Sequence, residues 1–403
     1  MKFSKLSQLV LVSTIGLLLA LCLTSCEIVT IDYVFVAASS GNGSGSAGEI
    51  YTFAADAESG ALRNGPPAVS SGGNSPVAMA VTADYYNLYV ANQGSNSVVH
   101  FSVADNGVLT KKDSVTTATP PVAVYANSAG TYLYVLTGTT TATLTEYSLS
   151  SGAVGNIVAQ EALAIPGYPS DSVVPTAVTV LPNSDAVYAT VYDQSAYNPG
   201  SITTSNANPG WVFGFAVGSG GALTPSVDSP YQAGVKPSAL SPDPTDRFVY
   251  VTDYASNELI GYGIQDGEEL EFLVNGPFKT GNEPSSVVVD PRGIFIYVSN
   301  SLDSTVSAYN ISLPTGTPSA TVNPTSAQSY STDTQPVSIT VEPALGRYVY
   351  TANHLGNSIS GFRLNPSTGV LTQTQATPYP TGENPTAVIA VPHGNHAIQA
   401  VFH

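Results

Sequence analysis

Half-buried β-strands are predicted along the whole chain, because short segments of alternating apolar and polar residues recur in it. Three kinds of segment repeat. The first begins with proline and continues apolar, the second has an aliphatic-Tyr-Val pattern, and the third is centred on an aromatic residue. A weaker fourth segment follows a turn that contains glycine. We name the four predicted strands A, B, C and D in this order.

Each of the three marker residues occurs seven times. The prolines that open the A segments are Pro76, Pro121, Pro175, Pro237, Pro284, Pro336 and Pro385. The tyrosines of the B segments are Tyr33, Tyr89, Tyr134, Tyr188, Tyr250, Tyr297 and Tyr350. The aromatic residues of the C segments are Phe53, Phe101, Tyr147, Phe215, Tyr262, Tyr309 and Phe362.

Seven copies of a four-stranded antiparallel unit predict an all-β protein, a seven-bladed β-propeller. The 378 residues from Cys26 onward give 54 per unit. A β-sandwich or β-helix explains this period less well. Because the chain starts in a B segment and ends in an A segment, strands from both termini are expected to close the ring. Tyr33 and Ile398 both lie in B-like segments, and either can complete the last blade.

The N-terminus has the pattern of a secretory signal. Lys2 and Lys5 precede an apolar stretch from Leu9 to Leu23. The following Thr-Ser-Cys26 resembles a bacterial lipobox, which implies cleavage before Cys26 and lipidation of its thiol. The alternative is an ordinary secretory signal in which Cys26 is incidental. We therefore expect a signal peptide over residues 1–25, a lipidated cysteine and short tether over 26–32, and the propeller over 33–403.

Lipidation predicts an extracytoplasmic protein, periplasmic or at the cell surface, that is held by its membrane anchor. Cys22 is lost with the signal and Cys26 is acylated, so no thiol remains for a disulfide, a metal site or a nucleophile. The net charge of −17 becomes −19 when Lys2 and Lys5 are removed. So acidic a chain is a poor match for the phosphates of a nucleic acid, and we expect no nucleic-acid partner.

The repeats resemble a known family. Pro76-Val77-Ala78 followed by Leu88-Tyr89-Val90-Ala91-Asn92 looks like the YVTN propeller repeat, and Lys236-Pro237 through Val249-Tyr250-Val251-Thr252 repeats it. The turn from Asn365 to Thr372 resembles the blade ending of lactonase-family propellers, whose members include 6-phosphogluconolactonase. The resemblance covers essentially all of the mature chain. It implies a seven-bladed propeller, lactone hydrolysis and no cofactor.

Propeller topology sorts the loops onto two faces. D–A and B–C connections gather around the mouth of the central channel, which we call the mouth face, and A–B and C–D turns gather on the opposite turn face. Ligand sites form where loops converge on a cavity. Arg247, Arg292 and Arg347 lie in A–B turns and are expected to be solvated there. The polar residues expected on the mouth face are Asn92, Lys236, Asp253, Tyr254, Glu258, Lys279, Glu283, Asp303, His354 and Glu383.

Lactone hydrolysis needs a base to activate water and a donor to stabilise the oxyanion. Asp253, Glu283 and His354 are the candidate bases, and Lys236 is the candidate donor. The resemblance also implies a channel His and Arg, often just after the proline of strand A. Here the two positions after those prolines are Val-Ala, Val-Ala, Thr-Ala, Ser-Ala, Ser-Ser, Val-Ser and Thr-Ala. This departure argues against a phosphorylated substrate, which needs several cations.

Two further features are weaker. The long B–C loop from Asp193 to Gly210 contains Tyr197 and precedes Trp211, and it is either a ligand-binding loop or an unselected insertion. His393 and His396 have a spacing suited to zinc but no third ligand, so no metal site is expected.

The sequence leaves two functions open. One is a lactone hydrolase, or a binder of a small neutral molecule, at the channel mouth. The other is a non-catalytic scaffold for envelope proteins or glycans.

Overall fold

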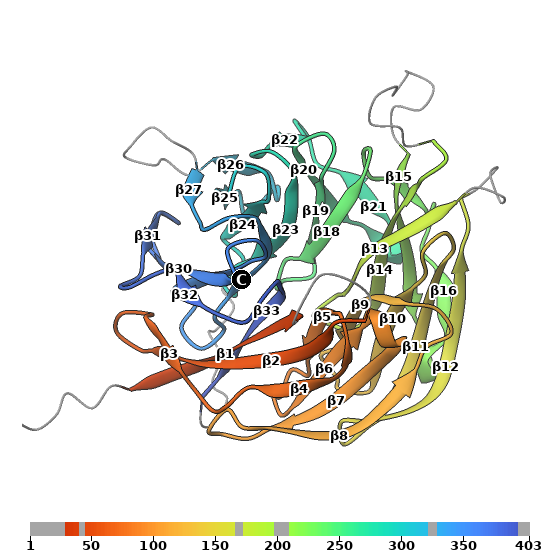
Figure 1. The fold of residues 1–403 in the computed structure, drawn as a ribbon. Helices are drawn as coiled ribbons and strands as arrows, with labels where there is room; N and C mark the ends of the chain where they lie inside the picture. The colour runs from red at the N-terminus through yellow and green to blue at the C-terminus, as the bar shows by residue number, and fades with distance from the viewer. Residues whose placement is uncertain (1–28, 40–44, 166–171, 197–208, 321–328, 394–403) are drawn as a thin grey trace, which may run out of the picture.

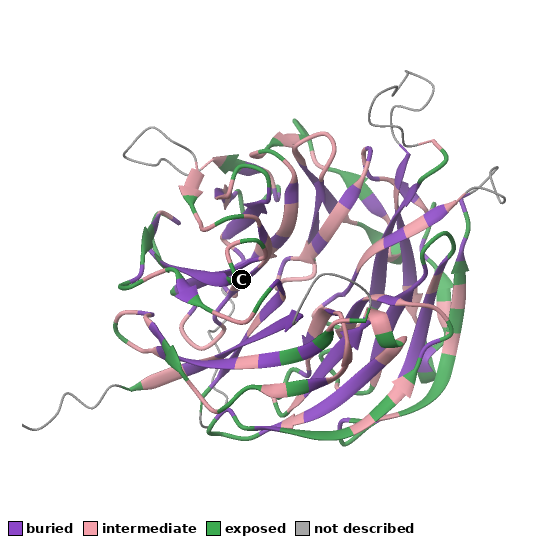
Figure 2. Ribbon diagram, in the orientation of Figure 1, coloured by how far each residue is buried: buried purple, intermediate pink, exposed green. Residues whose placement is uncertain are grey.

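The computed structural model describes residues 29–39, 45–165, 172–196, 209–320 and 329–393. They form seven antiparallel sheets arranged as blades around a common axis (Figure 1). In each blade strand A is innermost and strand D outermost. Figure 2 shows exposed residues concentrated on outer strands such as β8 and β12. No described helix is long and apolar enough to cross a membrane.

The strands follow the predicted order in every blade. Strands A are, for blades 1 to 7, β5 (Pro76–Val81), β9 (Pro121–Ala126), β13 (Val173–Val180), β18 (Pro237–Pro242), β23 (Pro284–Val289), β28 (Pro336–Val341) and β33 (Pro385–Pro392). Strands B are β6 (Asn87–Asn92), β10 (Tyr132–Thr137), β14 (Ala186–Asp193), β19 (Phe248–Asp253), β24 (Phe295–Asn300), β29 (Tyr348–Asn353) and β1 (Thr30–Ser39). Strands C are β7 (Ser97–Val103), β11 (Ala142–Ser150), β15 (Gly210–Val217), β20 (Glu258–Ile264), β25 (Thr305–Ile311), β30 (Ser358–Leu364) and β2 (Ala47–Asp56).

Strand D is continuous in two blades and divided in five. It is β8 (Leu109–Thr116) in blade 1 and β12 (Ala153–Leu163) in blade 2. The divided strands are β16 (Leu223–Pro225) with β17 (Tyr231–Gln232), β21 (Leu270–Phe272) with β22 (Phe278–Lys279), β26 (Pro318–Ala320) with β27 (Ser329–Ser331), β31 (Leu371–Gln373) with β32 (Tyr379–Pro380), and β3 (Leu62–Asn64) with β4 (Val69–Asn74). Single 3-10 turns occur at η1 (Gln93–Ser95), η3 (Ser219–Gly221) and η4 (Asp266–Glu268).

All 21 predicted marker residues lie in the expected strands, which confirms the seven-fold repeat. Every strand A contains a β-bulge between its proline and the second residue after it. Proline has no N–H to offer a ladder, so it is tolerated at such a bulge. The bulge also turns the residue after proline away from the regular pleat at the channel mouth.

The tyrosines of strands B join neighbouring blades. The Tyr250 hydroxyl donates to the carbonyl of Gly316, 2.7 Å away in the C–D turn of the next blade. Four other B-strand tyrosines, in blades 1, 3, 5 and 6, make the corresponding bond to the next blade. Gly316 has a φ of +68°, and a Cβ there would lie 2.3 Å from the Phe248 ring. Only glycine therefore fits this turn against the preceding blade.

The hydrophobic core is divided among the seven interfaces between blades. Each of the seven buried clusters combines residues of two neighbouring blades, and one of them closes the ring between blades 7 and 1. The blades are therefore stable only as neighbours, as expected for a repeat protein in which each unit buries its faces against the next.

The structure identifies the strand that completes the last blade. Strand β1 lies between β2 and β33, and Val34 is opposite Ala390. The first strand thus begins at Thr30, three residues before the expected propeller boundary. Ile398 lies outside the described residues.

Candidate functional site

Backbone hydrogen bonds repeat around the channel mouth. The residue that follows strand B donates its amide to the carbonyl of the residue before the proline of strand A. Tyr254 donates to Lys236 at 2.9 Å, and Ser301 donates to Glu283 at 2.8 Å. The same backbone hydrogen bond occurs in three other blades, where the amide donates to the carbonyl in the pairs Gln93 to Ser75, Gly138 to Pro120 and His354 to Gln335. The fold thus presents a ring of paired positions whose side chains can be varied without changing the backbone.

Blades 4 and 5 fill these positions with a connected polar cluster. The Lys236 ammonium lies 4.8 Å from the centre of the Tyr254 ring and 5.4 Å from that of Tyr192. The Tyr254 hydroxyl donates to Glu283 Oε2 at 2.6 Å. The Ser301 hydroxyl lies 3.3 Å from the same carboxylate oxygen. We call Lys236, Tyr254, Glu283 and Ser301 the mouth cluster.

The electrostatics of the mouth cluster make Lys236 a better proton donor than an exposed lysine. Burial lowers the pKa of the Lys236 ammonium, and the nearby negative charge of Glu283 partly offsets this effect. Glu283 itself is half-buried and has a φ of +55°, a backbone conformation that few residues other than glycine adopt. The residues before the prolines of three other strands A, which are Ser75, Gln335 and Asn384, have the same positive φ. This backbone conformation therefore belongs to the repeat, and the hydrogen-bonded carboxylate is what distinguishes Glu283.

Two other predicted site residues, Asp253 and His354, make no described contact with the side chains of the cluster. Asp253 is fully buried, and its carboxylate accepts the backbone amides of Val235 at 2.7 Å and Lys236 at 2.9 Å, together with two amides of its own loop. It therefore fixes the loop that carries Lys236. The His354 ring lies one blade further on, with Nδ1 3.2 Å from the Pro385 carbonyl oxygen. The structure gives it no described contact with Glu283.

The remaining mouth-face candidates are engaged in loop contacts. Lys279 forms an exposed ion pair with Glu258 at 2.6 Å. Asp303 accepts the backbone and side-chain amides of Asn282 at 2.7 and 2.9 Å. The buried Asn92 accepts the Ser71 hydroxyl at 2.6 Å.

The structure describes only part of the loop from Asp193 to Gly210, and only one of the two histidines with zinc-like spacing. Trp211 is half-buried and packs on the core between blades 2 and 3, while Tyr197 lies outside the described residues. His393 packs edge-on against Tyr33 with ring centres 5.4 Å apart, and His396 lies outside the described residues. In the described part of the chain, no three His, Cys, Asp or Glu side chains come together as metal ligands.

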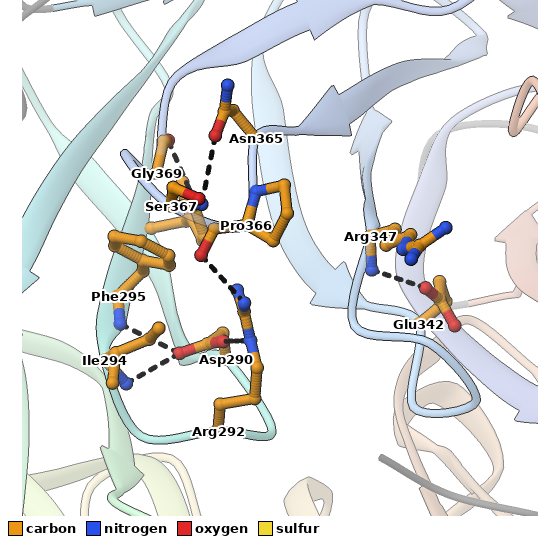
Figure 3. Close-up of polar contacts among 11 residues, drawn as sticks. Asp290, Arg292, Ile294, Phe295, Glu342, Arg347, Asn365, Pro366, Ser367 and Gly369 are labelled. Carbon is orange, nitrogen blue, oxygen red and sulfur yellow. Dashed lines mark hydrogen bonds and ion pairs between the residues drawn. The ribbon is translucent and has the colours of Figure 1, made fainter. Parts of the chain in front are cut away.

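The three turn arginines lie on the turn face as predicted, but one of them is not solvated. Arg292 is 7% exposed, and its Nε donates to Asp290 at 2.8 Å (Figure 3). Its Nη1 donates to the Pro366 carbonyl of the next blade at 2.9 Å. The expectation of a solvated Arg292 is therefore wrong, because the C–D turn of the neighbouring blade covers it. Arg247 and Arg347 are exposed.

The positions after the A-strand prolines have a structural use. The Ser238 hydroxyl donates to the carbonyl of Pro284 in the next blade at 2.6 Å, and Ser285 donates to that of Pro336 at 2.7 Å. The Thr386 hydroxyl of blade 7 donates to the carbonyl of Pro76 in blade 1 at 2.8 Å, where the ring closes. These hydroxyls join the inner strands of neighbouring blades at the positions where the family resemblance implies His or Arg.

A cavity of about 260 Å³ lies at the opposite end of the channel, lined by residues such as Met79, Tyr85, Tyr125 and Ile389. Its lining includes no Asp, Glu, Lys or His. It therefore has no base for hydrolysis, and the mouth cluster remains the better candidate for chemistry.

The comparisons with known proteins agree with this architecture. The family model described as lactonase, 7-bladed beta-propeller, matches residues 47–168 and 126–400. The chain belongs to this family. No sequence among curated proteins matches it.

Solved structures resemble this lactonase propeller over nearly its whole length. The periplasmic gluconolactonase of Pseudomonas aeruginosa superposes with a TM-score of 0.73 and 15% identity, covering 91% of this chain and 100% of its own. A proposed 6-phosphogluconolactonase of Bacteroides fragilis gives a TM-score of 0.70 and 17% identity, covering 91% of this chain and 99% of its own. At these identities the likeness establishes the fold.

Sequence reasoning placed Lys236 and Glu283 on one face but did not assign Tyr254 or Ser301 to the site. The signal for both was available, since each directly follows a strand B. In blades 4 and 5 that position is hydrogen-bonded to the residue before the strand A proline of the same blade. Pairing the two loop positions blade by blade would have identified the cluster.

Proposed function

We propose that this protein hydrolyses an uncharged sugar lactone at the mouth cluster, as a lipid-anchored protein of the cell envelope. The observation that carries the proposal is the connection of Lys236, Tyr254 and Glu283. The Lys236 ammonium, whose pKa is lowered, lies over the ring of Tyr254. The hydroxyl of the same tyrosine donates to the Glu283 carboxylate of the next blade. Membership of the lactonase family supports the reaction class.

The mouth cluster has the groups that ester hydrolysis requires. Glu283 takes a proton from water as the water oxygen attacks the lactone carbonyl carbon. The Lys236 ammonium stabilises the oxyanion that forms on the carbonyl oxygen. When the intermediate collapses, the ring C–O bond breaks and the protonated Glu283 returns its proton to the departing ring oxygen. The product is the open hydroxy acid, and Glu283 is again a carboxylate.

The charge of the chain favours a substrate without phosphate. The net charge is −17, and the mouth cluster contributes one cation against one carboxylate. Phosphate binding normally uses several cationic donors. The gluconolactonase named among the similar structures is the neighbour whose name implies an unphosphorylated lactone. The half-buried Tyr254 carries an aromatic ring suited to packing against a sugar ring.

The test is a panel of phosphorylated and unphosphorylated aldonolactones on the purified protein without its signal peptide. We expect turnover of an unphosphorylated lactone, and a loss of about 100-fold or more in kcat/KM for Glu283→Gln. Glu383→Gln is the matched control, since it removes a mouth-face carboxylate outside the cluster and should retain activity. Absence of turnover above the uncatalysed rate on every lactone would refute the proposal.

Lys236 is tested by its replacement with methionine, which keeps the length of the side chain. We expect Lys236→Met to lower kcat by about 100-fold with a smaller change in KM, because the oxyanion forms only in the transition state. Lys279→Met removes an exposed lysine of the same face and serves as control. A change confined to KM would assign Lys236 to substrate binding and contradict its proposed role.

A second candidate function is a scaffold that binds envelope proteins or glycans. It is favoured by Leu302 and Leu355, which are 64% and 60% exposed in equivalent B–C loops of neighbouring blades. Exposed leucines on a loop-rich face are typical of contact surfaces. Replacing both by aspartate should abolish such binding and leave lactone turnover unchanged.

A further inference from the structure

We propose that the turn face of the propeller lies against the membrane, so that the channel mouth and the mouth cluster face away from it. The inference rests on the lipid anchor at Cys26 that forms part of the proposed function. It adds an orientation, and it names the lipid surface as the partner of the turn face.

The first step is the position at which the described chain enters the ring. The Val29 carbonyl accepts the amide of Ala57, which belongs to the C–D turn of blade 7, at 2.9 Å. Thr30 is paired with Asp56, the last residue of β2, and Asp32 with Pro392 at the end of β33. Strand β1 therefore starts on the turn face and runs toward the mouth face.

The second step is that this starting point is fixed. β1 is hydrogen-bonded on both sides, to β2 from Thr30 to Ser39 and to β33 from Asp32 to Ala38. Asp32, Val34, Phe35 and Val36 are fully buried. The N-terminal strand thus cannot swing over the rim of the ring without opening blade 7.

The third step is the reach of the tether. Three peptide steps separate Cys26 from Val29, which is at most about 10 Å of extended chain. The ten residues of β1 rise about 33 Å from the turn face toward the mouth. The tether is therefore about three times too short to bring the mouth face to the lipid surface while the acyl chains are inserted.

The turn face carries arginines close to the point where the chain enters the ring. Arg63 Nη2 is 3.5 Å from the Thr30 hydroxyl, directly beside the chain exit, and the exposed Arg247 and Arg347 lie in A–B turns of the same face. Arginine suits contacts with lipid phosphates. The described A–B and C–D turns carry more carboxylates than arginines, among them Asp84, Asp246 and Glu58, so the acyl anchor, and not net charge, holds the face in place. Val29, 62% exposed, extends the apolar surface next to the anchor.

The orientation is tested with two labels in the same blade. Leu313 is 39% exposed in the C–D turn of blade 5, and Leu302 is 64% exposed in its B–C loop. Because the processed and acylated protein has no other thiol, Leu313→Cys and Leu302→Cys each give a single site for a fluorophore. The lipidated proteins are reconstituted in vesicles that contain a lipid with a quencher on its headgroup.

We expect the label at position 313 to lose fluorescence and the label at position 302 to remain unquenched. Quenching at position 302, or equal quenching at both positions, would overturn the orientation. The anchor is tested separately by fractionation of the Cys26→Ser variant, which should leave the membrane fraction or remain unprocessed. If that variant is processed and stays on the membrane, the lipid anchor itself fails, and the orientation falls with it.

Discussion

In two A–B turns of the turn face a buried carboxylate accepts backbone amides of its own turn, but the charges around the two carboxylates differ (Figure 3). In blade 5 Asp290 accepts the amides of Ile294 and Phe295, both at 2.8 Å. In blade 6 Glu342 accepts the amides of Leu345 and Arg347. Both carboxyl groups are fully buried. Each one therefore satisfies backbone donors that the turn would otherwise leave without partners.

The surroundings of the two carboxylates differ. Asp290 is paired with the buried Arg292, whose guanidinium also lies 5.3 Å from the centre of the Phe295 ring. Glu342 has the exposed Arg347 in its turn and the buried Asp32 of β1 nearby. Burial raises the pKa of both Asp32 and Glu342, and the charge of Glu342 raises the pKa of Asp32 further. The comparison teaches that burial alone does not decide the cost of a carboxylate, since a neighbouring charge either offsets that cost or adds to it.

Removing the compensating cation should give the largest effect. Arg292→Met leaves Asp290 buried without its partner, and we expect a loss of about 3 kcal/mol in the free energy of unfolding. The control is Arg347→Met, which removes an exposed arginine and should change stability by less than about 0.5 kcal/mol. Denaturant unfolding monitored by intrinsic fluorescence measures both. Equal effects would mean that the Asp290 pair is not what distinguishes the two turns.

Removing one of the two like charges should stabilise the protein. Asp32→Asn keeps the shape of the side chain and abolishes its ionisation. We expect a gain in the free energy of unfolding at pH 7, because asparagine cannot carry the charge that burial and the neighbouring Glu342 disfavour in Asp32. Glu58→Gln, an exposed carboxylate of the neighbouring C–D turn, is the matched control and should be neutral. A loss of stability in Asp32→Asn would contradict a charge conflict with Glu342.

The same pair predicts the pH dependence of stability. Because the folded-state pKa of Asp32 is raised, the folded protein binds more protons than the unfolded chain between the unfolded pKa of about 4 and the raised value. Stability that is present below pH 4 is therefore lost as the pH rises through this window. The loss should be smaller in Asp32→Asn, as measured by melting temperature from pH 4 to 8. Parallel profiles for the two proteins would exclude Asp32 as the titrating group.

The smallest expected effect concerns the neighbouring turn that covers Arg292. Asn365 Oδ1 accepts the amide of Ser367 at 3.0 Å and so orders the turn that presents the Pro366 carbonyl to the guanidinium. Asn365→Ala should cost about 1 kcal/mol, the value of a typical hydrogen bond. In the Arg292→Met background its cost should fall, because the two sites then no longer interact. Additive effects would place the turn outside the Arg292 network.

The sequence was sufficient for the fold because every blade repeats the same local signals. The proline, tyrosine and aromatic markers each depend on contacts within a blade or with the next one, and a period of about 54 residues reveals them together. The choice of β1 over the segment around Ile398 was not predictable, since both have the pattern of a half-buried strand.

The site was predictable only in part, because its side chains meet across blades. Lys236 and Glu283 could be placed on one face by topology, whereas the bridge through Tyr254 depends on the direction of a side chain. Asp253 is an acid at the right end of a strand, and no pattern distinguishes a loop-organising carboxylate from a base. Arg292 was expected in water because the turn that buries it lies 74 residues later in the chain.

The closure of the ring also sets the order of events when the protein is made. β1 is made long before its partner β33, since Asp32 is paired to Pro392 across 360 positions. Until β33 arrives, Val34, Phe35 and Val36, which are fully buried in the finished ring, remain without one of their two neighbours. The ring can therefore close only after β33 has been made, and a chain that lacks β33 keeps one open edge on the strand that follows its predicted anchor.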